Sequence, residues 1–238
     1  MRSRLHTCGS VTSAGKNTWP IVLITSFSVA ALALTALAQT GANNAEVADN
    51  EAPQYSSPED PKRPRWHFRV REPARLSDEE AEKVYRRLKW RLSRRYKLSR
   101  LPVARYYQRW RRYNKTPYRS TTHGKRYVNN YANGRAHAYG TYEKAGKMPV
   151  GAILAKDSIT VKRDGRVIPG PLFIMQKMSA GFSYVSGDWR YTMVMPDGSV
   201  FGETKGTSSE RVEFCISCHL AAEKNDHLFF MPKKYRNE

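Results

Sequence analysis

The stretch from Val150 to Phe201 reads VGAILAKDSITVKRDGRVIPGPLFIMQKMSAGFSYVSGDWRYTMVMPDGSVF, and it indicates the class of fold. Short apolar runs alternate in it with turn residues such as Asp164-Gly165 and Pro196-Asp197-Gly198. The pattern predicts strands over 150–156, 158–161, 172–175, 190–195 and 199–201. Because helical patterns lie on both sides of the stretch, we expect an α+β fold, a mainly antiparallel β-sheet with helices at both ends.

The segment before this stretch carries two helical patterns. Ser77-Asp78-Glu79-Glu80 is a capping-box sequence, and apolar residues recur after it at helical spacing. Pro102 interrupts the pattern, and a second helical run is expected over 103–113. A further helix is expected from Tyr127 to Lys144, ended by Gly146. The stripe of the first helix consists of Val84, Leu88, Leu92 and Tyr96; that of the second consists of Val103, Tyr106, Tyr107, Trp110 and Tyr113.

The N-terminus has the features of an export signal. Basic residues precede the uncharged, mostly apolar run from Trp19 to Ala38, which ends in the small-x-small pattern Ala36-Leu37-Ala38. We therefore expect 1–38 to be a signal peptide, or alternatively an uncleaved N-terminal anchor, because the run approaches the span of a bilayer. Either alternative predicts a periplasmic protein. Residues 39–64 have the composition of a disordered linker.

Positive charge is concentrated in one part of the chain. The protein has 41 Lys and Arg against 21 Asp and Glu, and residues 61–119 hold 21 of the former and five of the latter. We interpret 65–119 as a basic helical extension that precedes the domain of 120–238. Its aromatic stripes are expected to pack on that domain and to leave a solvated arginine face. An anionic membrane surface is a secondary partner, whereas export argues against nucleic acid.

The sequence Cys215-Ile216-Ser217-Cys218-His219 is the attachment motif of c-type haem. Two thiols at this spacing reach the two vinyl groups of one haem, and His219 then provides the proximal ligand of the iron. A redox dithiol or half of a zinc site would be alternatives. However, the only other cysteine is Cys8, in the leader, and no thioredoxin-like pattern surrounds the motif. We therefore expect one covalently attached haem c.

The ligand opposite His219 stays open at this point. A methionine there would make the protein an electron carrier, whereas an open position would admit nitric oxide or hydroxylamine. His227 is expected to cap or hydrogen-bond near the core residues Phe229 and Phe230 and not to bind iron. The candidate methionines are Met175, Met178, Met193, Met195 and Met231.

Four segments, 148–157, 170–175, 187–191 and 214–219, together resemble the cytochrome P-460 family, which includes cytochrome c-prime-beta. The resemblance covers about 121–236. It implies a mainly antiparallel β domain, commonly a homodimer, with one five-coordinate c-type haem. In the enzymatic members a strand lysine is cross-linked to the haem, and Lys156 is the matching residue here. The family's enzymes oxidise hydroxylamine and pass electrons to an acceptor protein.

The expected distal side departs from the enzymatic pattern. Gln176 stands where a carboxylate would be useful, and an amide cannot accept a proton at neutral pH. Asp188 is expected to form a turn, and Arg126 is a candidate distal cation. We predict a monohaem cytochrome acting on hydroxylamine or nitric oxide. Non-catalytic nitric oxide binding and plain electron transfer with Met ligation are the alternatives.

Overall fold

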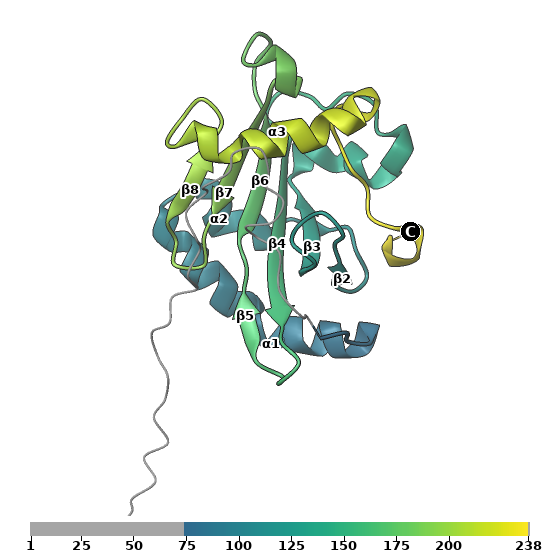
Figure 1. Ribbon diagram of the computed structural model, residues 1–238. Helices are drawn as coiled ribbons and strands as arrows, with labels where there is room; N and C mark the ends of the chain where they lie inside the picture. Colours follow the sequence, from purple (N-terminus) through teal and green to yellow (C-terminus); the bar gives the residue numbers. More distant parts are fainter. Residues whose placement is uncertain (1–73, 238) are drawn as a thin grey trace, which may run out of the picture. The chain divides into compact units, whose positions relative to one another are not determined.

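The computed structural model describes residues 74–237 (Figure 1). The expected signal peptide or anchor of 1–38 and the expected linker of 39–64 lie outside these residues, and so does the start of the basic extension. Among residues 74–237, no helix combines the length and the apolar character that crossing a membrane requires.

In residues 74–237, an antiparallel sheet of eight strands forms the centre of the fold, and helices cover it, so the predicted α+β class is confirmed. The strand order is β1-β3-β4-β6-β7-β8, with β2 paired to β3 and β5 paired to β4. The strands are β1 Arg111–Arg112, β2 Tyr118–Arg119, β3 Tyr127–Ala132, β4 Ile153–Val161, β5 Val167–Pro169, β6 Leu172–Lys177, β7 Trp189–Val194 and β8 Val200–Glu203.

Within the described residues, three α-helices accompany the sheet, together with several short 3-10 segments. The α-helices are α1 Asp78–Tyr96, α2 Pro102–Tyr106 and α3 Glu213–His219. The 3-10 segments are Lys97–Ser99, Tyr107–Arg109, Gly134–Lys144, Tyr184–Ser186, Ser209–Val212, Leu220–Asn225 and Lys233–Tyr235.

Helix α1 begins as the sequence predicts. The Ser77 side chain accepts from the Glu80 amide at 3.2 Å, and the Ser77 amide donates to the Glu80 carboxylate at 2.8 Å. This capping box satisfies donors that the first turn of a helix otherwise leaves unpaired. Further along α1, Leu92 and Tyr96 of the expected stripe are buried, and Tyr85, which the pattern did not include, is buried too.

Two helices were predicted with the wrong extent. The second helical run ends at Arg109, because Arg111 and Arg112 pair with β3 as strand β1. The expected helix from Tyr127 begins instead with strand β3, followed by a 3-10 segment. All six residues of β3 are buried, and the strand is paired on both edges, so it lacks the solvent-exposed face that an amphipathic surface helix has. The expected strands 150–156 and 158–161 form one continuous strand, β4, which begins at Ile153, so residues 150–152 are not part of it.

The two faces of the sheet carry different layers. Helices α1 and α2 pack on one face, against side chains such as Tyr131, Ala155 and Ile159. Helix α3 and the C-terminal segment cover the other face, and Figure 1 shows α3 crossing in front of the strands with α1 and α2 behind them. Since successive strand residues point to opposite faces, Lys156 points to the α3 side and Asp157 to the α1 side.

Candidate functional site

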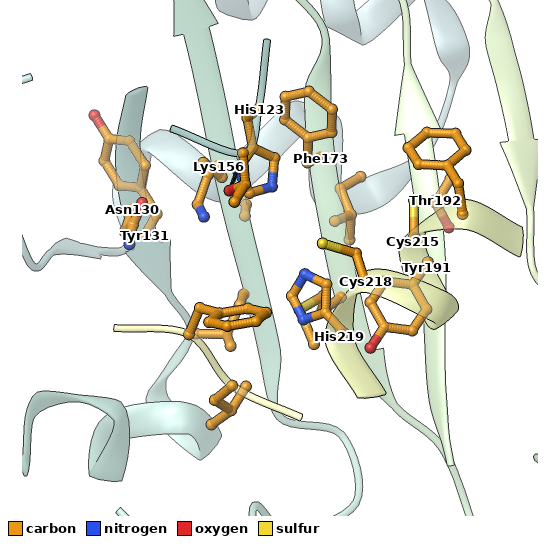
Figure 2. Close-up of a pocket in the computed structure, with 18 of the residues that line it drawn as sticks. His123, Asn130, Tyr131, Lys156, Phe173, Tyr191, Thr192, Cys215, Cys218 and His219 are labelled. Atoms are coloured by element: carbon orange, nitrogen blue, oxygen red, sulfur yellow. Dashed lines mark hydrogen bonds between the residues drawn. The ribbon is translucent and has the colours of Figure 1, made fainter. Parts of the chain in front are cut away.

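A cavity of about 240 Å³ lies between α3 and the sheet. Its walls come from β3, β4, β6 and β7, from the loop around His123, from α3 and from residues 228–229. Most of the surface that lines it belongs to apolar atoms, and no Asp or Glu of the described part of the chain lines it. Figure 2 shows that side chains distant in sequence meet in this space, among them Lys156 and His219.

Helix α3 carries the haem-attachment motif into the cavity. Cys215, Cys218 and His219 occupy positions i, i+3 and i+4 of the helix, which lie on one face, and all three line the cavity. The two thiols are free. Burial raises the pKa of the Cys215 thiol to about 12, and the nearby Cys218 adds to the effect. The helical spacing thus presents two thiols and an imidazole to one ligand.

The His219 imidazole is held in the orientation of a metal ligand. Its Nδ1 lies 2.7 Å from the backbone oxygen of His227, and because a carbonyl only accepts, Nδ1 carries the proton and Nε2 keeps its lone pair. Burial lowers the pKa of His219 to about 4, so the ring is neutral at pH 7. The rings of Tyr191 and Phe229 lie 5.1 and 5.2 Å from it, centroid to centroid, and fix its position.

Lys156 of β4 projects into the same cavity. Burial lowers the pKa of its amine from 10.5 to about 8, an effect that Cys218 partly opposes. A larger fraction of the amine is therefore uncharged at neutral pH than for a lysine in water. Lys156 therefore lines one cavity with Cys215, Cys218 and His219, and its cross-link to a haem stays a prediction.

A second histidine, His123, lines the cavity and was missed in the sequence. Its Nδ1 lies 3.1 Å from both the Ser120 and the Thr122 hydroxyl oxygen, which leaves Nε2 for a ligand in the cavity. The ring packs edge-on against Phe173, with 4.7 Å between centroids. In Figure 2 His123, Lys156 and Phe173 lie close together and apart from the His219 ring.

The surroundings of His123 favour its neutral form. Burial is the main cause that holds the pKa of His123 well below its usual value of 6.5. The positive charges of neighbouring Lys156 and Arg126 act in the same direction. A neutral imidazole can accept a proton, which an amide cannot.

Two expected site residues do not line the cavity. Gln176 follows Met175 on β6, and since Met175 packs on the cavity side, the alternation of the strand turns Gln176 to the other face. The prediction that Gln176 lines the distal side of the haem site is therefore wrong. Arg126 is buried beside Gly170 and does not line the cavity, although its positive charge contributes to the low pKa of His123.

The other residues named in the sequence have clear positions. Asp188 forms a turn, as expected, with its Oδ1 accepting from the Ser183 amide at 2.8 Å. His227 is buried and supports His219 through its carbonyl. Phe229 is not a core residue, because 39% of it is exposed and it lines the cavity. Of the five candidate methionines, Met175 lines the cavity.

The donors of the cavity fit a haem. Cys215, Cys218 and His219 offer two thiols and one imidazole from a single face of α3, the donor set that covalent attachment of a haem and ligation of its iron require. Tyr191 lines the cavity, and its buried hydroxyl has no hydrogen-bond partner among the described residues, which leaves a polar contact for that group.

Comparisons with known proteins agree with this reading of the site. The family model described as Cytochrome P460 matches residues 104–230, which is more than half of the chain. No curated protein matches the sequence significantly. The matched range includes the cavity-lining strands, His123, Lys156 and the motif of α3, and the family implies a haem cofactor. The chain belongs to the cytochrome P460 family.

Proposed function

We propose that this protein is an exported monohaem c-type cytochrome that binds hydroxylamine or nitric oxide and oxidises hydroxylamine, passing electrons to an acceptor protein. The observation that carries the proposal is the meeting of Cys215, Cys218, His219, Lys156 and His123 in one cavity. This set provides thiols for attachment, an imidazole for iron, an amine and a proton acceptor.

Cys215 and Cys218 would hold the haem through thioether bonds, and Nε2 of His219 would bind its iron. The bound haem supplies a position for a small nitrogenous ligand and a centre that exchanges electrons. The hydrogen bond from His219 Nδ1 to the His227 carbonyl keeps the imidazole in the required tautomer. The rings of Tyr191 and Phe229 restrict its rotation.

Lys156 would provide the lysine cross-link that the family resemblance implies. The amine lies in the cavity with the two thiols, and its pKa of about 8 leaves part of it uncharged and nucleophilic near neutral pH. Phe173, directly opposite Lys156 in the pairing of β4 with β6, also lines the cavity and limits the space around the amine.

His123 would accept the proton that hydroxylamine loses on oxidation. The Ser120 and Thr122 hydroxyls can donate to or accept from Nδ1, so His123 can hold its proton on either ring nitrogen. The imidazole can therefore receive a proton at Nε2 and release one from Nδ1 toward these hydroxyls. This role replaces the one that Gln176 could not fill.

Non-catalytic binding of nitric oxide is the second candidate function. It is favoured by the lining of the cavity, in which the described part of the chain places no carboxylate. Electron transfer with Met ligation would depend on Met175, since the other four candidate methionines do not line the cavity.

The experiment combines the optical spectrum of the ferrous protein, mass spectrometry of its haem peptides and hydroxylamine turnover. We expect a high-spin spectrum, a peptide that joins Lys156 to the haem of Cys215 and Cys218, and loss of that link in Lys156→Met but not in Lys147→Met. Replacing His123 by Gln should lower turnover by roughly 100-fold or more, as for loss of a general base, and replacing the exposed His137 by Gln should not.

Three results would decide against parts of the proposal. A low-spin, six-coordinate spectrum abolished by Met175→Leu would establish the electron carrier. Nitric oxide binding without hydroxylamine turnover would establish the binding protein. Full hydroxylamine turnover in His123→Gln would remove His123 from the mechanism while leaving the haem site intact.

A further inference from the structure

The outward face of α1 forms a continuous basic stripe. Exposed positions recur along it at spacings of three and four residues, which lie on one side of a helix. Five of the six carry arginine and the remaining one carries tryptophan. We call them the α1 stripe: Arg86, Arg87, Trp90, Arg91, Arg94 and Arg95. From Arg86 to Arg95 the stripe runs about 14 Å along the helix.

The charges of the α1 stripe are not neutralised by any described residue of the chain. Within residues 74–237, none of its five arginines forms an ion pair. The acids of α1 lie near its N-terminal end, where Glu80 belongs to the capping box and Glu82 pairs with Arg112 at 3.0 Å. The stripe therefore presents positive charge of one sign to whatever approaches this face.

An exposed indole lies in the middle of these charges. Trp90 is 59% exposed, and the Arg94 guanidinium lies 5.4 Å from its ring centre. Leu98, just beyond the end of α1, is 67% exposed. The opposite side of the helix, by contrast, is buried in the core through Tyr85, Leu92 and Tyr96. Trp90 thus contributes nothing to the core and is available to a partner.

We propose that the α1 stripe docks on the surface of an anionic phospholipid membrane. Indole rings favour the headgroup region, and arginines around them can reach the phosphates while their aliphatic parts cover apolar surface. Charges of one sign that are spread along one side of the helix, and that form no ion pair within residues 74–237, match a surface with uniform negative charge.

Docking through α1 would determine which way the cavity faces. Helix α1 and the cavity lie on opposite faces of the sheet. A molecule attached through the α1 stripe would therefore turn its α3 face, with the candidate haem site, away from the membrane. Figure 1 shows the two layers on either side of the strands.

The test uses the full haem-loaded chain and two kinds of vesicle, one of phosphatidylglycerol mixed with phosphatidylcholine and one of phosphatidylcholine alone. The measured quantity is the ratio of the two affinities by co-sedimentation, in which uncharged contributions from residues 19–38 cancel. The stripe variant is Arg87→Gln, Arg91→Gln, Arg94→Gln. The matched control, Lys144→Gln, Lys147→Gln, Lys224→Gln, removes three exposed charges elsewhere.

We expect the wild-type protein to prefer anionic vesicles and the stripe variant to lose roughly 100-fold of that preference, since each basic residue near such a surface contributes about fivefold. The control should change it by less than about threefold, as expected for charges far from the surface. Replacing Trp90 by Ser should weaken binding to the anionic vesicles even at high salt, because burial of the indole is not screened.

Two results would overturn the proposal. One is an equal loss of preference in the stripe variant and in the control, which would mean that net charge alone is responsible. The other is stripe-dependent binding to polyglutamate with no preference of the wild-type protein for anionic vesicles, which would assign the stripe to an acidic protein.

Discussion

Replacing Asp157 by Asn should make the protein more stable at neutral pH. Asp157 is fully buried on the α1 side of the sheet. Its Oδ2 accepts from the hydroxyls of Tyr85 at 2.7 Å and Tyr107 at 3.0 Å, and its Oδ1 accepts from Asn129 Nδ2 at 3.1 Å. Burial nevertheless outweighs these hydrogen bonds and raises the pKa of Asp157 from 3.8 to about 6.

This rise in pKa means that folding favours the protonated acid. The folded state is therefore more stable at low pH than at high pH, by about 3 kcal/mol in total. This extra stability is fully present below pH 3.8 and is lost as the pH rises through about 6. About 2 kcal/mol of this change falls between pH 4 and pH 7. The amide introduced by Asp157→Asn would stay neutral throughout and keep the two tyrosine bonds through its oxygen. It would lose the bond from Asn129, at a cost of about 1 kcal/mol that does not depend on pH.

The assay is chemical unfolding of both proteins across this pH range. We expect wild type and Asp157→Asn to have similar free energies of unfolding at pH 4, and the variant to be more stable by about 2 kcal/mol at pH 7. Other groups that titrate in this range, such as His219, are common to both proteins and cancel in the difference. If the two proteins differed in free energy of unfolding by the same amount at pH 4 and pH 7, the argument that burial disfavours the ionised form of Asp157 would be refuted.

Two further comparisons test packing. Leu92→Ala should cost about 2 to 5 kcal/mol because Leu92 is buried, whereas Leu98→Ala, at an exposed site, should change the free energy of unfolding by less than about 0.5 kcal/mol; equal effects would mean that α1 does not pack as described. Gly187→Ala should cost about 1 to 3 kcal/mol more than Gly146→Ala: both glycines have positive φ, but only a methyl group at Gly187 meets the His227 ring, at 2.5 Å. The Gly187 variant should also shift the haem spectrum, since the His227 carbonyl supports His219; an unshifted spectrum would contradict that support.

Local patterns in the sequence predicted the features that depend on neighbouring residues. The capping box at Ser77 and the meeting of Cys215, Cys218 and His219 on one side need only helical spacing. The strands after Val150 follow from apolar runs and turns. In each case the physical cause lies within a few residues of the feature.

Other features depend on contacts between distant segments. Tyr127–Ala132 is a strand because it is paired on both edges and covered on both faces, and no local pattern reveals that cover. The prediction for Gln176 failed because a shift of one residue along a strand moves a side chain to the other face of the sheet. His123 has no motif spacing to α3, and only the folded chain brings it into the cavity with His219.

The position of β4 explains why α1 belongs to the same folded unit as the cavity, although the family match begins only at residue 104. Lys156 reaches the cavity from one face of β4, while the adjacent Asp157 is held on the other face by Tyr85 of α1. A fragment limited to 104–230 would lose that hydroxyl and expose the core side chains that α1 covers, among them Ala155 and Ile159. An unsatisfied buried carboxyl and exposed core side chains both favour unfolding. We therefore expect this fragment to remain unfolded, as circular dichroism and proteolysis would detect, whereas a fragment beginning at residue 74 should fold. A cooperative unfolding transition in the shorter fragment would show that α1 is an addition to the haem domain and not a part of it.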